Sequence, residues 1–309
     1  MRRIIGLIAI VVLLVMILAI ITPYFFTRDN LVVLINNIAL EAIALSGYTL
    51  LLIGGYFDLS IDGIVSITGV VAGLMMLSGV PWPIAVVVAL CLSGLVGFIN
   101  GFVVVKLGIN GLIATLTTWW ICIGIALGLT KALAPYGFPP SFQVIGQVQF
   151  LGLRSAVICA IFVIVILSVI LHFHKIGAHI YASGDNKQSS QMMGINVTRL
   201  GIGLYVLVGL LSGFIGLMIA SRLNAASPIA VDGMALRVIA AVVIGGGSLS
   251  GGKGSIVAGL LGLVIMHILS NAIIQLGISP YWQKTLLGGV LLLAVLSEKV
   301  NLNFRRVIK

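Results

Sequence analysis

The sequence predicts an all-α integral membrane protein that crosses the bilayer about ten times and contains glycine-interrupted spans. Hydrophobic residues make up 61% of the 309 residues and charged residues only 8%, whereas soluble domains are about 25% charged. Apolar runs of about 20 residues, long enough to cross a hydrocarbon core about 30 Å thick, recur along the chain. We therefore expect a single membrane domain over residues 1–309, with no soluble domain attached.

The first predicted span covers residues 4–22 and ends at Pro23. Its apolar run is longer than that of a usual signal peptide, and no small-residue cleavage site follows it. We therefore expect it to remain as a span, with the N-terminus in the cytoplasm. The other predicted spans cover about residues 31–53, 64–78, 84–105, 111–130, 155–173, 200–221, 238–249, 255–276 and 281–297.

Ten spans divide the 17 lysines and arginines unevenly between the two sides of the membrane, with eleven in the cytoplasm. The six on the opposite side are Arg28, Lys131, Arg154, Arg222, Arg237 and Lys284. This bias agrees with the positive-inside rule. It places the loops 131–153 and 222–237 outside and the polar segment 174–199 in the cytoplasm. The net charge of +10 therefore reflects topology, and we expect no nucleic-acid partner.

Two glycine-rich stretches interrupt apolar segments, LIGGYFDLSIDG at residues 52–63 and VIGGGSLSGGKG at residues 243–254. Glycine weakens a helix interior, and Asp58, Ser60 and Ser250 are residue types that can cap a new helix. Each stretch thus reads as helix, break, helix. In lipid, such a break persists only where protein or a water-filled cavity surrounds it. Paired breaks in two halves of a chain point to a solute pathway; chance similarity in a glycine-rich chain is the alternative.

Polar residues inside the spans are the other candidates for a pathway. Glu41 is an acid well inside an apolar run, where it either faces a cavity or a partner, or is a protonated or hydrogen-bonded structural residue. His267, Asn271 and Gln275 share one helical face, and we favour hydrogen bonds between helices over pathway lining for this stripe. The candidate path residues are Glu41, Gly54, Gly55, Asp58, Ser60, Gly245, Gly246 and Asn271.

The sequence offers no enzyme chemistry. Residues 247–254 almost spell a phosphate-binding loop, but Gly254 stands where a hydroxyl must bind Mg²⁺. No nucleophile–base pair and no set of His, Cys and acidic residues at ligand spacing occurs. An intramembrane enzyme would need His and acids clustered at one depth, which the sequence does not show. We therefore expect no catalytic residue, no metal site and no cofactor on this chain.

The polar segment 174–199 contains a predicted helix of its own. Asp185 and Asn186 are cap types, residues 187–193 have adequate helix propensity, and Gly194 closes the helix. We expect a short exposed helix between two spans, on the cytoplasmic side.

Three motifs resemble those of a known family, the membrane permease subunits of bacterial ABC importers for ribose, xylose, galactose and related sugars, including autoinducer-2 uptake permeases. They are GGYFDLSIDG at 54–63, GDNKQSSQMMGINV at 184–197 and VIAAVVIGGGSLSGGKGS at 238–255. The likeness covers about residues 30–297. The chain departs from the family pattern in having Arg237 for an Asp, Ala235 for a Glu, Asp62 near a usual Gly or Val, Ser189 and Ser190 for paired alanines, an extra residue between Gly55 and Asp58, and an unusual Glu41.

The resemblance implies a multi-pass permease of the bacterial inner membrane that forms a translocation path for a sugar or sugar-like solute. It implies three kinds of protein partner: a second permease copy or a related permease, two cytosolic ATP-binding subunits, and an extracytoplasmic solute-binding protein. Segment 174–199 is then the coupling element that docks on the ATPase, through Gly184, Asp185, Asn186, Ser189, Ser190 and Gly194. The alternative is an ATPase-independent channel or facilitator for small polar solutes.

Overall fold

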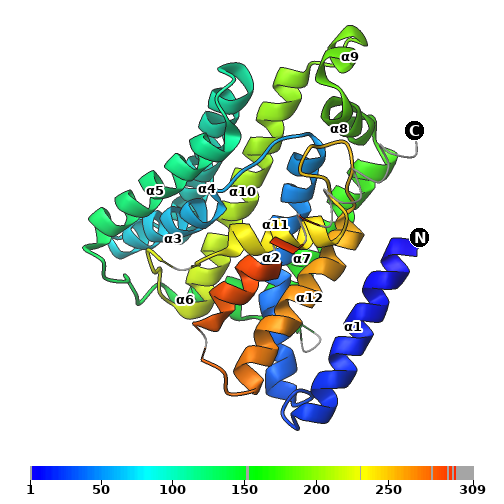
Figure 1. The fold of residues 1–309 in the computed structure, drawn as a ribbon. Helices are drawn as coiled ribbons and strands as arrows, with labels where there is room; N and C mark the ends of the chain where they lie inside the picture. The colour runs from blue at the N-terminus through cyan, green and yellow to red at the C-terminus, as the bar shows by residue number, and fades with distance from the viewer. Residues whose placement is uncertain are drawn as a thin grey trace.

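The computed structural model describes residues 2–150, 153–229, 231–279, 281–290, 292, 293 and 296. Within these residues, seven helices are long and apolar enough to cross a membrane. They are α1 (Arg2–Ile21), α2 (Arg28–Ile53), α4 (Trp82–Gly101, continued by a π-helix at Phe102–Lys106), α5 (Gly111–Thr130), α7 (Ser155–Phe173), α10 (Val197–Leu223) and α12 (Ile256–Gln275). Two shorter apolar helices, α3 (Ile61–Leu77) and α11 (Met234–Ile244), lie among them (Figure 1).

These helices confirm the all-α membrane fold. Each of the first nine predicted spans coincides with one of them. The tenth predicted span, 281–297, falls partly outside the described residues, and residues 282–290 are helical. The basic tail with Lys299, Arg305, Arg306 and Lys309 also lies outside the described residues.

The order long helix, extended stretch, short helix occurs twice and in opposite directions (Figure 1). α2 leads through residues 54–60 into α3, and α10 leads through residues 224–233 into α11. The packing follows the same scheme, because α10 contacts α3 and α4 whereas α2 contacts α11 and α12. Both short helices begin inside the bundle, where Ile61 and Met234 are buried. The first extended stretch is enclosed by protein, because Tyr56, Asp58 and Ser60 are buried, as a break in a membrane helix requires.

Helix α2 forms the centre of the largest hydrophobic cluster, which also takes residues from α7, α10 and α11. From residue 39 to its end at Ile53, α2 is buried throughout. α1 lies at the edge of the bundle, where it packs on α12 and leaves many apolar side chains exposed. Such a face suits contact with lipid tails.

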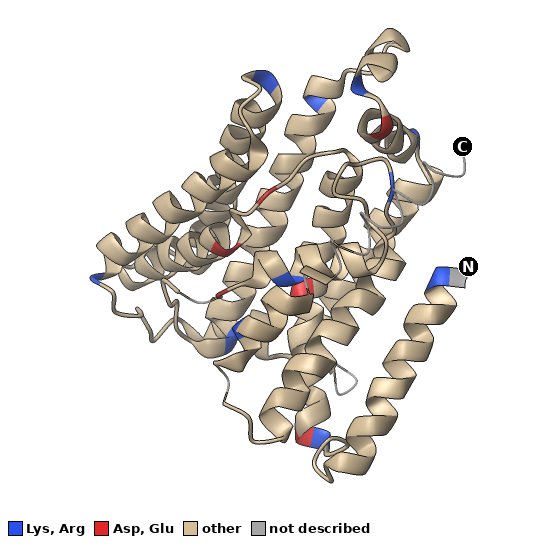
Figure 2. Cartoon of the chain, in the orientation of Figure 1, with Lys and Arg blue, Asp and Glu red and all other residues tan. Residues whose placement is uncertain are grey.

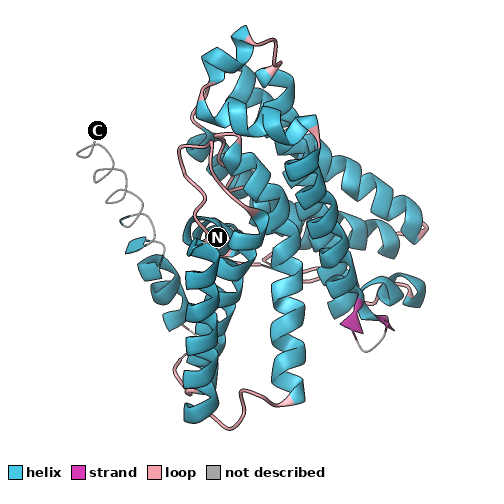
Figure 3. Ribbon diagram, turned by 90° about the vertical axis from the view of Figure 1, so that its right-hand side faces the viewer, coloured by secondary structure: helices cyan, strands magenta, loops and turns pink. Residues whose placement is uncertain are grey.

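Two connections carry secondary structure of their own. The connection between α5 and α7 contains α6 (Pro140–Gln147) and a small antiparallel pair, β1 (Gln149–Phe150) and β2 (Leu153–Arg154), drawn as the strands of Figure 3. This agrees with the structured loop predicted for residues 131–153. The other contains α8 (Lys175–Asp185) and α9 (Lys187–Met192). Only α9 was expected. α8 is amphipathic and gains its stability by packing on α2 and α7.

Two sequence-based assignments are wrong. Arg237 was placed in an outer loop, but α11 begins at Met234, so Arg237 lies inside the bundle. Ser250 was expected to cap the helix after the second break, but Ser255 does so, accepting from the N–H of Ala258. Ser60 occupies the N-cap position of α3, after the first break, but its side chain makes no capping hydrogen bond.

Candidate functional site

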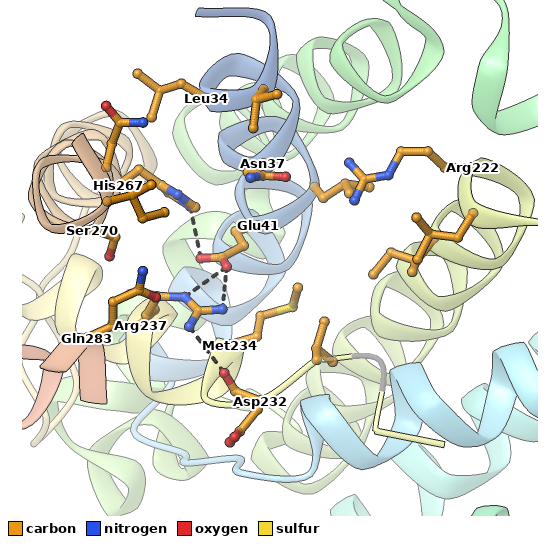
Figure 4. Close-up of a pocket in the computed structure, with 17 residues that line it drawn as sticks. Leu34, Asn37, Glu41, Arg222, Asp232, Met234, Arg237, His267, Ser270 and Gln283 are labelled. Carbon is orange, nitrogen blue, oxygen red and sulfur yellow. Dashed lines mark hydrogen bonds and ion pairs between the residues drawn. The ribbon is translucent and has the colours of Figure 1, made fainter. Parts of the chain in front are cut away.

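A cluster of ionisable side chains lies in the middle of the bundle. Figure 2 shows few charged residues along the helices, apart from a small group near the centre. There, Oε1 of Glu41 on α2 accepts from Nε of Arg237 on α11 at 2.9 Å and lies 2.7 Å from its second terminal nitrogen. Nε2 of His267 on α12 lies 3.1 Å from the other carboxylate oxygen (Figure 4). The cluster therefore joins three helices through one carboxylate.

These three side chains line a cavity of about 340 Å³ between α2, α10, α11 and α12. Small-molecule sites begin at about this volume. Arg222 of α10 projects into the cavity from the wall opposite the cluster (Figure 4). Further polar lining comes from Asn37, Asp232, Ser270, Asn271 and Gln283, and the rest is aliphatic. Glu41 combines features of both alternatives. It lines a cavity, as a pathway residue would, and it accepts a hydrogen bond from Arg237, as a structural acid would.

The polar stripe on α12 joins helices, as predicted. Asn271 and Asn30 exchange amide hydrogen bonds, at 2.7 and 3.3 Å. The hydroxyl of Thr22 donates to Oε1 of Gln275 at 3.4 Å. His267 contacts Glu41, so all three stripe residues contact a neighbouring helix or the segment that precedes it. Asn271 also lines the cavity.

The polar residues of the first break lie away from this cavity. Asp58 and Ser60 are fully buried, and Oδ1 of Asp58 accepts from the N–H of Ser60 at 2.7 Å and from its hydroxyl at 2.6 Å. Asn100 of α4 donates to Ser60 at 2.8 Å, and Thr118 of α5 donates to Asn100 at 2.6 Å. This chain of bonds fixes the break against α4 and α5. Asp58 thus organises its own turn and does not cap α3 directly.

The glycines of the two breaks meet α8 at the end of the bundle that the charge bias assigns to the cytoplasm. The N–H of Gly252 donates to the carbonyl of Ile53, the last residue of α2, at 2.8 Å. Gly184 of α8 packs so closely here that a Cβ on it would overlap that same carbonyl oxygen. Gly55 adopts φ 76° beside Gly184. Gly54 follows directly after α2.

Two side chains add to this junction. The hydroxyl of Tyr181 on α8 donates to the carbonyl of Gly254 at 2.9 Å. The ammonium of Lys187 on α9 lies 4.2 Å from the centre of the Tyr56 ring, a cation–π contact. Burial lowers the pKa of Lys187 below its ordinary value. The polar segment 174–199 therefore contacts both glycine-rich breaks.

The remaining residues proposed for coupling lie on or beside α9. Oδ1 of Asn186 accepts from the N–H of Ser189 at 3.0 Å, so the predicted cap is confirmed. Asp185 ends α8, Ser189 is exposed and Ser190 is buried. Gly194, with φ 81°, reverses the chain after α9, as expected of a closing glycine.

Helix α11 is held at both ends by charged side chains from other helices. Asp62 of α3 accepts from the backbone N–H groups of Gly233 and Ala235, both at 2.8 Å. Arg3 of α1 donates to the carbonyls of Val243 and Ile244, both at 3.1 Å. An anion at the N-terminus and a cation at the C-terminus both suit the helix dipole. Gly245 and Gly246 follow at this end, where Gly246 lies next to the guanidinium of Arg3 and Gly245 packs against the backbone of Ala258 on α12.

Sequence reasoning missed Arg237, Asp62 and Arg3 as members of these contacts, and it placed His267 in the stripe that joins helices without pairing it with Glu41. One signal was present: Glu41, Asp62, Ala235 and Arg237 were all noted as departures from the family pattern. The structure places Arg237 on Glu41 and the N–H of Ala235 on Asp62. These four residues therefore form two contacting pairs, and the members of each pair are more than 170 positions apart in the sequence.

Apolar helices, a helix break at residues 54–60 enclosed by protein and a polar cavity inside the bundle are the features of a multi-pass membrane transport protein. Comparison with known sequences gives its family. The chain belongs to the family described as the permease component of branched-chain amino acid transport systems, whose model matches residues 27–295. Like its relatives, it is a multi-pass protein of the bacterial inner membrane.

Similar proteins cover almost the whole chain. The ribose import permease protein RbsC of Escherichia coli (strain K12) is 36% identical over 298 residues, 95% of this chain and 92% of the relative. RbsC of Bacillus subtilis (strain 168) is 35% identical over 289 residues, 93% of this chain and 90% of the relative. The L-arabinose ABC transporter permease protein AraH of Azospirillum brasilense is 31% identical over 304 residues, 98% and 90% of the two chains. No solved structure matches. The resemblance drawn from the three motifs is confirmed.

Proposed function

We propose that this chain is the membrane-spanning subunit of an ABC importer and forms the path through which a monosaccharide or a sugar-like solute enters the cell. One observation carries the proposal. The chain is similar, over at least 93% of its length, to permeases named for ribose and L-arabinose import. The permease pair is completed by a second copy or a related chain, and a solute-binding protein delivers the solute from outside.

ATP binding belongs to two separate cytosolic subunits in this proposal. The loop at 247–254, which resembles a phosphate-binding loop, uses its backbone N–H groups within the protein. Gly251 donates to Ser248, Ser248 donates to Lys253, and Gly252 donates to Ile53. These bonded groups are not free to cradle a phosphate. The geometry of this loop therefore supports a division of labour in which other subunits bind ATP.

The α8–α9 pair is the proposed coupling element. It contacts the end of α2 through Gly184 and the loop after α11 through Tyr181. α2 in turn carries Glu41 and α11 carries Arg237, the two sides of the central ion pair. A displacement of α8–α9 by the ATPase thus has a direct route of packed backbone to the cavity. Coupling of this kind requires contacts that differ between two states.

The exposed side of α9 offers an apolar contact for the ATPase. Met192 is 89% exposed and Met193 is 68% exposed, at the end assigned to the cytoplasm. We expect Met192→Glu and Met193→Glu to prevent copurification of the ATPase subunit and to abolish solute-stimulated ATP hydrolysis. The matched control is Leu107→Glu, an apolar residue of another cytoplasmic connection that is 57% exposed. Normal assembly and stimulation in both methionine variants would rule out this docking surface.

A further inference from the structure

The central ion cluster has more hydrogen-bonding capacity than its internal contacts use. A guanidinium carries five N–H donors. Two N–H groups of Arg237, one on Nε and one on Nη2, face Glu41. A third, on Nη1, donates to the backbone carbonyl of Asp232 at 3.2 Å. Two of the five N–H groups therefore remain, and 24% of the side chain is exposed. The exposed part faces the cavity (Figure 4).

Packing alone does not account for this cluster. An ion pair inside a membrane bundle is costly to desolvate, and apolar side chains of similar volume would hold the helices at least as well. Asp62 provides the contrast. It is buried, it holds the same end of α11 through two backbone N–H groups, and it does not line the cavity. Asp62, an acid with a structural role, thus lies away from the cavity, whereas Glu41, Arg237 and His267 line it.

The charge of the cavity lining indicates the chemical class of its occupant. Two guanidinium groups, on Arg222 and Arg237, and two carboxylates, on Glu41 and Asp232, line the cavity. Glu41 pairs with Arg237 at 2.7 Å, and Asp232 pairs with Lys284, which lies outside the lining, at 2.6 Å. Because the charge of Arg237 is already paired within the protein, its remaining N–H donors do not require an anionic solute. Free N–H donors lie beside amide and hydroxyl groups, among them Asn37 and Ser270. Adjacent hydroxyl groups, each both donor and acceptor, satisfy such a mixture best.

We propose that Arg237 contacts the solute in the path, an inference that rests on the proposed function. Glu41 and His267 hold the guanidinium of Arg237 in position. The solute is an uncharged polyhydroxylated monosaccharide. Arg237 donates to one or two sugar hydroxyl oxygens from the cavity side of its guanidinium. Glu41 keeps the arginine neutralised, so that the contact is made without trapping the solute. Selection by hydroxyl pattern then occurs in the permease as well as in the binding protein.

The test measures solute preference in the complete importer, assembled with its ATPase and binding protein in vesicles. The probes are D-ribose, L-arabinose and 2-deoxy-D-ribose, each at saturating loaded binding protein, so that differences in maximal uptake arise in the permease. The variants are Arg237→Gln, the uncharged double variant Glu41→Gln/Arg237→Gln, and the swapped pair Glu41→Arg/Arg237→Glu. Neither double variant leaves a single buried charge unpaired, which protects folding.

We expect all three variants to change the ratio of maximal uptake among the probes by about tenfold, the factor that one hydrogen bond to a charged group commonly contributes. The matched control, Asp62→Asn, loosens α11 without altering the cavity lining. It should lower uptake of every probe by the same factor and leave the ratios unchanged.

Two results would overturn different parts of this proposal. If the swapped pair restores both the rate and the ratios of the wild type, or if all variants keep the wild-type ratios, Arg237 is only a structural partner of Glu41 and the inference is wrong. If the wild-type importer takes up none of the three probes with ATP, the proposed sugar transport fails first, and the inference fails with it.

Discussion

Gly252 donates its backbone N–H to the carbonyl of Ile53 at 2.8 Å and so joins the two glycine-rich stretches of the chain. The bond lies beside Gly184, at the contact between α8 and both breaks. Because α2 ends at Ile53 and α11 ends at Ile244, directly before the first glycine of the second stretch, this junction connects α8 and α9 to the two helices of the central ion pair. The glycines serve close backbone packing here, since side chains would separate the segments.

Substitution of Gly184 tests that junction. A Cβ at this position would overlap the carbonyl oxygen of Ile53 and approach the N–H of Gly252. We expect Gly184→Ala to lower the stability of the purified protein by about 1–3 kcal/mol, the usual effect of overpacking, and to weaken ATPase coupling. Thermal unfolding in detergent measures the first effect. The control is Gly203→Ala on α10, where nothing lies within 4 Å of the added methyl group. Equal stability of the two variants would disprove the close contact.

Asp58 acts in the structure as a hydrogen-bond acceptor for Ser60. We expect Asp58→Asn to be mild, with a loss below about 1 kcal/mol, because the amide oxygen keeps the acceptor. Asp58→Ala should cost about 1–3 kcal/mol, since it leaves buried donors of Ser60 unsatisfied. Unfolding midpoints of the purified variants provide the comparison. A large loss of stability in Asp58→Asn together with no loss in Asp58→Ala would contradict this role, because it would show that the charge of Asp58 matters and its hydrogen bonds do not.

Arg3 connects α1 to the C-terminal end of α11. A cation at this end of a helix contributes about 0.3–1 kcal/mol, and the two hydrogen bonds add to it. Arg3→Gln should therefore lower stability by about 1 kcal/mol, with Arg3→Lys between the variant and the wild type. Arg28→Gln, which removes an exposed charge at the start of α2, should have no comparable effect. Identical melting of all these proteins would contradict the assigned role.

Much of the fold could be predicted because membrane spans depend on local composition. Apolar length gave the spans, and residues such as Asn186 and Gly194 gave the boundaries of α9. The start of α11 could not be predicted in this way. Its N-cap position is Gly233, with φ 76°, and the acceptor that satisfies its backbone is Asp62 from another helix. A helix capped from a distance carries no local signal.

The candidate site was only partly predictable for a similar reason. Glu41 and Asn271 stood out as polar residues in apolar runs, and both line the cavity. Arg237 was assigned to a loop because the polar stretch 222–237 looks continuous in the sequence. The glycines of the breaks and Asp58 were grouped with Glu41, yet they belong to separate contacts. Tertiary pairing decides which polar groups share a cavity, and one sequence does not contain it.

ATP-dependent uptake by the complete importer decides whether this chain belongs to an ATP-driven sugar importer. The complex is placed in vesicles with ATP on the side of α8–α9, and with binding protein and labelled D-ribose or L-arabinose on the other side. We expect a sugar to accumulate above its external concentration only when ATP is present, and we expect this uptake to be lost in Gly55→Leu, where φ is 76° in the wild type. Uptake that proceeds equally without ATP and stops at equal concentrations would show a facilitator and would rule out an ATP-driven importer.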